Sequence, residues 1–315
     1  MDLLVDVLAD SVRDTIQLVP FLFLTYLAME AIEHSTEGRV RSLMGRVGAF
    51  GPIAGGLLGA LPQCGFSAMA ATLFAGGVVT TGTLVAVILS TSDEMVPVFL
   101  AHQEPISKLA AIIGIKIVVG VVAGILLDLV LKLIGRRQQD LRISELCERA
   151  DCHCDDEDET DDEAEGHDHD EHHDHHGHHH GHGRFAIVRS AAVHTAQVTA
   201  FIFAMSIVFG LVIELVGEES LALLLGRHPV RATALAGLVG LIPNCGASIV
   251  ICELYLSGSL ATGPMLAGLL VSGGVGLLVL FRTNVDLRQN LLVTAFVYAV
   301  GVLVGLIVGV AGIII

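Results

Sequence analysis

The chain has few charged residues for its length and lacks the composition of a soluble enzyme. Only 16% of its 315 residues are Asp, Glu, Lys or Arg, tryptophan is absent, and 53% are hydrophobic. Apolar runs recur from residue 16 to residue 315, and the mean hydropathy is +0.73. These properties are typical of a helical protein that crosses the membrane several times. We therefore expect no enzymatic activity.

The start of the chain lacks the basic residues of a cleaved signal peptide. Asp2, Asp6, Asp10 and Asp14 recur every four residues, which predicts the polar face of an interfacial helix. We expect no cleaved leader.

The negative charge belongs to one segment. The whole chain carries −16, and residues 140–183 hold 17 acids against Arg142 and Arg149, a net −15. This segment has almost no apolar content, so we expect residues 139–184 to form a disordered linker. It lacks regular zinc-finger spacing, but it contains eleven histidines between His153 and His182. Imidazoles in an acidic surround predict low-affinity capture of metal ions. The candidate ligands are Cys152, His153, Cys154, His167, His169, His172, His173, His175, His176, His178, His179, His180 and His182.

The six cysteines do not form a disulfide framework. Three lie in the linker region, and Cys64, Cys245 and Cys252 lie in apolar segments. A Cys-x-Cys beside histidines fits a reduced compartment better than an oxidising one.

A six-residue cluster occurs twice inside apolar sequence. It reads Pro62-Gln63-Cys64-Gly65-Phe66-Ser67 in the first half and Pro243-Asn244-Cys245-Gly246-Ala247-Ser248 in the second. Each cluster interrupts a membrane helix, and such a break is tolerated only where it faces protein or a polar cavity. Paired breaks in corresponding halves indicate the substrate site of a transporter.

The two halves align with a shift of 181 residues. The shift superimposes Glu33 on Glu214, Arg46 on Arg227, and Thr81-Gly82 on Thr262-Gly263 without a gap. We therefore predict an all-α polytopic protein with two repeats of about five helical segments each. Residues 1–138 form the first membrane repeat and residues 185–315 the second. Each repeat contains a broken segment, at 47–75 or 230–257, whose pieces are too short to cross the bilayer and form either a re-entrant hairpin or separate crossings.

An odd number of crossings per repeat inverts the second repeat. Twelve Lys and Arg residues then lie on the side of the linker, against four on the other side. The positive-inside rule predicts a protein of the cytoplasmic (inner) membrane, with the linker in the cytoplasm and both termini outside.

Thiols, amides and carboxylates are the candidate ion ligands. Cys64 and Cys245 favour soft metals and trivalent arsenic, whereas carboxylates favour manganese. Asp93 and Glu94 lie within apolar sequence, where they could bind a cation, exchange protons or balance Lys116. Glu253 is the second-half carboxylate near a Cys cluster. The predicted transport residues are Gln63, Cys64, Ser67, Thr91, Ser92, Asp93, Glu94, Asn244, Cys245, Ser248 and Glu253.

With these motifs, the chain resembles the ten-transmembrane heavy-metal exporter family, whose members are labelled arsenic-efflux or manganese transporters. The resemblance is carried by the two Cys clusters, by Ser90-Thr91-Ser92-Asp93-Glu94-Met95 and by the His-rich loop between the halves. It covers nearly the whole chain outside that loop. It implies a five-plus-five helical fold and ion efflux across the cytoplasmic membrane.

The sequence therefore predicts a secondary-active exporter of a manganese-, zinc-, cobalt- or arsenite-like ion. No nucleotide-binding loop is present, so we expect coupling to an ion gradient or to a partner. The metal is the transported substrate, and we expect no tightly bound cofactor and no nucleic-acid partner. A homo-oligomer is left open. Two alternatives are an importer with the same site and a thiol–disulfide electron carrier that uses Cys64 and Cys245.

Overall fold

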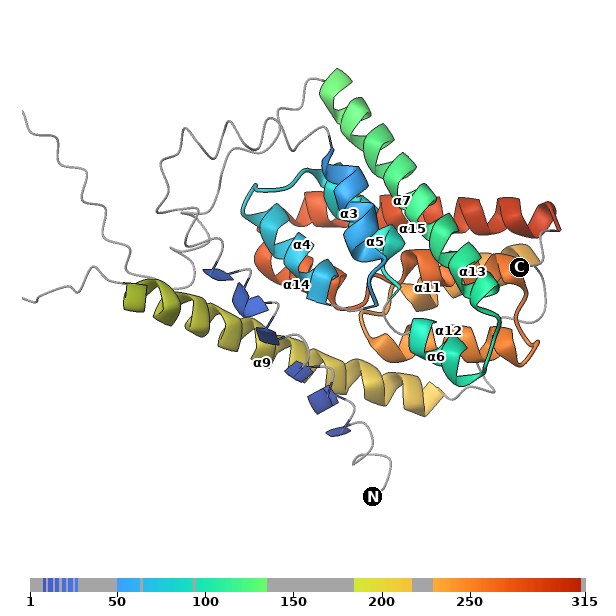
Figure 1. Cartoon of the computed structure of the whole chain (residues 1–315), viewed down its shortest axis with the longest axis horizontal. Helices are drawn as coiled ribbons and strands as arrows, with labels where there is room; N and C mark the ends of the chain where they lie inside the picture. The colour runs from blue at the N-terminus through green and yellow to red at the C-terminus, as the bar shows by residue number, and fades with distance from the viewer. Residues whose placement is uncertain are drawn as a thin grey trace, which may run out of the picture.

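A computed structural model of the chain contains helices connected by short turns, and no strand in the part that it describes (Figure 1). The described residues are 8–27 in part, 50–62, 65–92, 95–134, 184–216 and 229–312.

The first repeat contains five helices after the N-terminal segment. They are α3 (Gly51–Gly59), α4 (Gly65–Ala75), α5 (Thr81–Ser90), α6 (Met95–Ala101) and α7 (Ile106–Leu133). The side chain of Thr80 begins α5 because its hydroxyl accepts a hydrogen bond from the backbone N–H of Thr83. Pro105 precedes α7, where a proline is tolerated because the first N–H groups of a helix have no intrahelical partner.

The second repeat follows the same order. Its helices are α9 (Arg184–Val216), α11 (Pro229–Gly240), α12 (Cys245–Leu256), α13 (Thr262–Val271), α14 (Gly276–Thr283) and α15 (Leu287–Val310). The shift of 181 residues places α5 on α13 with the same first and last residue, and it places the start of α6 on the start of α14. The predicted all-helical fold with two repeats is therefore confirmed.

Packing within the repeats also corresponds. Helix α5 packs between α3 and α7, and α13 packs between α11 and α15. Glycines allow the closest contacts in both places. Cβ atoms added at Gly263 and Gly305 would each lie 2.6 Å from the carbonyl oxygen of the other residue, and Gly82 and Gly124 make the equivalent contact in the first repeat. Such close backbone approach between helices needs small residues.

The glycine contact in the first repeat predicts a stability difference between two substitutions on α7. The Cβ atom of Gly124→Ala would meet the carbonyl oxygen of Gly82 and lie 3.1 Å from the Cβ atoms of Ala86 and Pro52, whereas at Gly114 it would meet open space. We expect Gly124→Ala to lower the free energy of unfolding by about 1–3 kcal/mol through overpacking. Gly114→Ala should be neutral or slightly stabilising. Unfolding by SDS in mixed micelles measures both, and equal stability of the two variants would contradict the close packing.

The two repeats interlock through their short helices. Helix α4 of the first repeat packs on α14 of the second, and α12 of the second packs on α6 of the first. The central elements are the most buried. An 18-residue stretch of Thr262–Thr283 is 94% buried and one of Thr81–Ala101 is 69% buried, against 33% for α7 and 28% for α15. The pair α5–α6 and the pair α13–α14 therefore form the centre of the fold.

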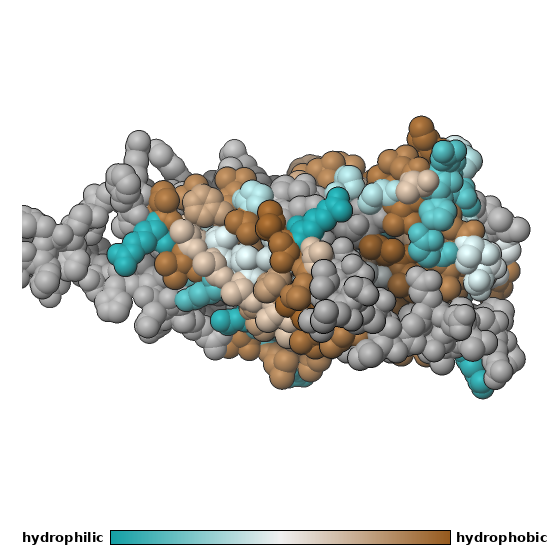
Figure 2. Space-filling model, turned by 90° about the horizontal axis from the view of Figure 1, so that it is seen from below, coloured by the Kyte–Doolittle hydropathy of each residue, from teal (hydrophilic) through white to brown (hydrophobic). Residues whose placement is uncertain are grey.

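The outer helices have apolar exposed surfaces. Five helical stretches in the described residues are long and apolar enough to cross a membrane: Thr81–Ala101, Ile106–Leu133, Ala191–Val208, Thr262–Thr283 and Leu287–Val310. Helix α7 exposes Val118, Val122 and Leu126, and α15 exposes Leu291 and Leu303. Apolar residues also dominate the face shown in Figure 2. These surfaces are suited to contact with lipid.

Helices α3, α4, α11 and α12 contain 9 to 12 residues each. At about 1.5 Å per residue they are roughly 14–18 Å long, about half of the bilayer core. The N-terminal helix lies beside α9, where the rings of Tyr26 and His194 stack with centroids 5.3 Å apart (Figure 1).

Candidate functional site

Two helix breaks lie at the centre of the fold. The sequence indicated one apolar segment at 78–100 and another at 259–281, but the structure divides each into two helices. Helix α5 ends at Ser90 and α6 begins at Met95, while α13 ends at Val271 and α14 begins at Gly276. We call residues 91–94 and 272–275 the central breaks. They expose backbone polar groups in the most buried part of the protein.

The first central break contains buried hydroxyls that bond to their own helix. Thr91 and Ser92 are 2% and 1% exposed. The Thr91 hydroxyl donates to the carbonyl oxygen of Val87 at 2.8 Å, and that of Ser92 donates to the carbonyl oxygen of Ser90 at 2.9 Å. In this arrangement both hydroxyl protons are engaged, and the oxygens keep lone pairs for a cation. Asp93 and Glu94 lie outside the described residues.

The second central break has no carboxylate. Ser272 is 3% exposed, and its hydroxyl has no hydrogen-bond partner among the described residues. The break then continues through Gly273 and Gly274, and Gly274 adopts a positive φ of 53° that favours glycine. Buried hydroxyls are usually hydrogen-bonded, so the unpartnered Ser272 marks a place where a ligand or water would fit. Sequence reasoning did not select Ser272, although its alignment with Thr91 was a usable signal.

Ser67 of the first Cys cluster lies against the second central break. A Cβ atom added at Gly276 would lie 2.6 Å from the Ser67 Cβ and 2.9 Å from its Oγ, so only glycine allows this approach. Ser67 is fully buried. The predicted relation between Cys cluster and transport site thus acts across the repeats, because α4 brings the first cluster to the break of the second repeat. Gln63 and Cys64 lie outside the described residues.

The second Cys cluster begins helix α12. Asn244 caps the helix by accepting a hydrogen bond from the N–H of Gly246 at 2.6 Å, and its amide donates to the carbonyl oxygen of Ser206 in α9 at 3.2 Å. The Ser248 hydroxyl donates to the carbonyl oxygen of Cys245 at 2.8 Å. Asn244 and Ser248 therefore hold the first turn of α12. This first turn places the thiol of Cys245, which is 4% exposed, inside the protein.

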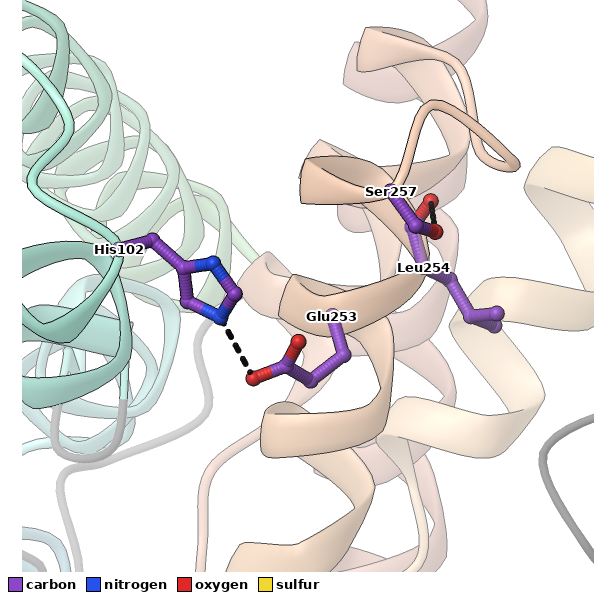
Figure 3. Close-up of polar contacts among 4 residues, drawn as sticks. All are labelled: His102, Glu253, Leu254 and Ser257. Carbon is purple, nitrogen blue, oxygen red and sulfur yellow. Dashed lines mark hydrogen bonds and ion pairs between the residues drawn. The ribbon is translucent and has the colours of Figure 1, made fainter.

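Glu253 lies away from the second Cys cluster, two turns further along α12. Its Oε1 atom is 3.0 Å from Nε2 of His102, which follows α6 (Figure 3). Both side chains are partly exposed, at 38% for Glu253 and 44% for His102. Glu253 thus joins the two repeats at the surface, where α6 meets α12. Nearby, the Nζ atom of Lys108 lies 4.7 Å from the ring centroid of Tyr255.

Lys116 is the cation buried between the repeats. It lies on α7, is 1% exposed and donates hydrogen bonds to the carbonyl oxygens of Thr91 and Leu269. The first acceptor belongs to the first central break, and the second belongs to the last turn of α13. The sequence pointed to Lys116 only as a partner for Asp93 or Glu94. A lone lysine in an apolar helix was the signal that would have placed it in the site.

In the described part of the chain, no group of three or more His, Cys, Asp and Glu side chains is arranged to hold a metal ion. Most of the predicted ligands lie outside this part. They are Gln63, Cys64, Asp93, Glu94 and all of the cysteines and histidines of the linker.

Searches among curated proteins and among solved structures found no match. A family model does match the chain in two parts, residues 1–182 and residues 182–313, and its description reads "Putative, 10TM heavy-metal exporter". The boundary between the two matches lies at the end of the His-rich segment. The chain, an all-helical protein with several membrane-length helices and two repeats, therefore belongs to the family of ten-transmembrane heavy-metal exporters.

Proposed function

We propose that this protein is a secondary-active transporter that exports a heavy-metal or metalloid ion across the cytoplasmic membrane. The ion is of the manganese, zinc, cobalt or arsenite class, and it crosses at the two central breaks. The observation that carries this proposal is the contact of Ser67 with Gly276 beside the buried, unpartnered hydroxyl of Ser272. A polar position buried between two repeats is the expected location of a transporter's substrate.

Ligands of two chemical types supply the proposed site. Cys245 contributes a buried thiol at the start of α12, and Cys64 is its repeat partner. Thr91 and Ser92 contribute buried hydroxyls next to Asp93 and Glu94. Thiols bind soft and borderline ions, whereas carboxylates and hydroxyls bind hard ions. The carboxylates of Asp93 and Glu94 are also the groups that would exchange protons with the coupling gradient.

The linker supplies the ion from the cytoplasm. Eleven histidines and the surrounding acids raise the local concentration of cations beside the membrane. The positive-inside rule supports this orientation, because twelve Lys and Arg residues share the linker's side. Export follows if metal is captured on this side and released on the other.

Transport in proteoliposomes tests the proposal. We expect the purified protein to move at least one of Mn²⁺, Zn²⁺, Co²⁺ and arsenite about tenfold faster than protein-free vesicles do. An imposed proton gradient should accelerate the flux, because no nucleotide-binding loop is present to use ATP. Vesicles with the linker on a known side separate export from import. Failure to move any of the four ions, with a correctly folded protein, would refute the transporter function.

A further inference from the structure

We propose that the ammonium group of Lys116 is a tethered cation that permanently fills a cation position between the two repeats, so that transport requires no free monovalent cation there. The inference rests on the transporter function proposed above and specifies how one part of that site works.

Lys116 faces the protein interior rather than the bilayer surface. It lies on the buried face of α7 that also contains Ile112, Gly120 and Gly124 at four-residue intervals. Only 1% of the residue is exposed. A lysine in the middle of a membrane helix is unfavourable by several kcal/mol unless polar groups receive its charge. The sequence therefore retains this lysine at a site where such groups are available.

The acceptors of Lys116 are the carbonyl ends of two broken helices. The Thr91 carbonyl directly follows the last residue of α5, and the Leu269 carbonyl, 2.8 Å from Nζ, belongs to the last turn of α13. The last four carbonyls of a helix have no intrahelical partner, and they carry partial negative charge. The ammonium thus binds the negative ends of one helix from each repeat.

This chemistry is that of a coupling-ion site. In secondary transporters, unwound carbonyls and the C-terminal ends of half-helices coordinate a small cation near the centre of the membrane. Here Nζ takes that position, and its N–H groups satisfy the carbonyls as a bound cation would. Because the cation is covalently attached to α7, it cannot dissociate during the cycle.

The cation comes from one repeat only. The shift of 181 residues places Val297 of α15 at the position of Lys116, and Val297 is fully buried among apolar residues. A single ammonium therefore serves carbonyls from both repeats, and Val297 offers a matched control. A substitution at Val297 changes buried volume at the related position without removing a charge.

The first test compares ion dependence of metal flux in vesicles containing choline, sodium, potassium or ammonium chloride at equal ionic strength and pH. The wild-type protein and Val297→Ala should show the same flux in all four salts. Lys116→Ala leaves the carbonyls without a cation but with space for one. We expect its flux to fall at least about tenfold in choline and to recover to within about threefold of wild type in at least one small cation. Lys116→Met fills the space without a charge, so its flux should stay low in every salt.

The second test needs no transport. The thermal midpoint of purified Lys116→Ala in detergent should rise by about 3 °C in the salt that restores flux, because that cation binds the folded state. Lys116→Met and the wild type should show no such rise relative to choline.

Two results would overturn the tethered cation. One is wild-type flux of Lys116→Met, since no charge would then be needed. The other is a folded Lys116→Ala protein that no small cation stabilises or reactivates. A cation-dependent stabilisation of Lys116→Ala in a protein that moves none of the four metal ions would instead support the cation position and refute the proposed transport.

Discussion

Replacing Cys64 and Cys245 together with serine should reduce metal flux on the order of a hundredfold, while the thermal stability of the purified protein stays near that of wild type. The substitution is nearly isosteric, and a serine hydroxyl within a helix can bond to a carbonyl of the preceding turn. It removes the soft sulfur ligand, which an oxygen does not replace for a soft or borderline ion. Cys245 is 4% exposed in the first turn of α12, so water cannot easily supply a substitute ligand there.

Cys252→Ser is the matched control for this experiment. Cys252 lies on the same helix, two turns after Cys245, and is fully buried. It has no counterpart in the first Cys cluster, so we expect its replacement to leave flux within about twofold of wild type. Flux is measured in vesicles with each candidate ion, and each single serine variant is included. Full transport by the double variant would eliminate both a thiol ligand site and a thiol–disulfide relay.

Deleting residues 151–183 should raise the half-saturating metal concentration about tenfold and leave maximal flux nearly unchanged. The segment holds eleven histidines and most of the acids of the linker. These groups increase the local metal concentration beside the cytoplasmic mouth without contributing to the central breaks, which is an effective-concentration effect. The order of preference among ions should therefore stay the same. Flux measured over a range of metal concentrations gives both parameters.

A second variant separates metal capture from the physical connection between the repeats. It keeps the length and the acids of the segment but replaces its histidines with glutamine, which removes the imidazole ligands. We expect it to show most of the affinity loss of the deletion. Loss of transport at saturating metal, or a changed ion preference, would place the linker within the translocation site and contradict a site at the central breaks.

The repeat was readable from sequence because small residues and turn residues recur in the same phase. Thr81-Gly82 and Thr262-Gly263 begin the two central helices, and the helix boundaries follow the same shift. The glycines recur because their close contacts, Gly82 with Gly124 and Gly263 with Gly305, leave no space for a side chain. The membrane class follows from composition alone, since long apolar segments with few charges cannot form the surface of a soluble protein.

Composition and repeat phase thus determined the helical membrane fold, the two breaks at the Cys clusters and the family resemblance. Only the tertiary structure decided which break each cluster faces, that Lys116 joins both repeats, and that Glu253 pairs with His102 at the surface. The physical reason is that these helices are apolar on nearly every side, so their periodicity does not show which face meets which neighbour. That choice depends on contacts such as Ser67 against Gly276, between residues more than 200 positions apart in the chain.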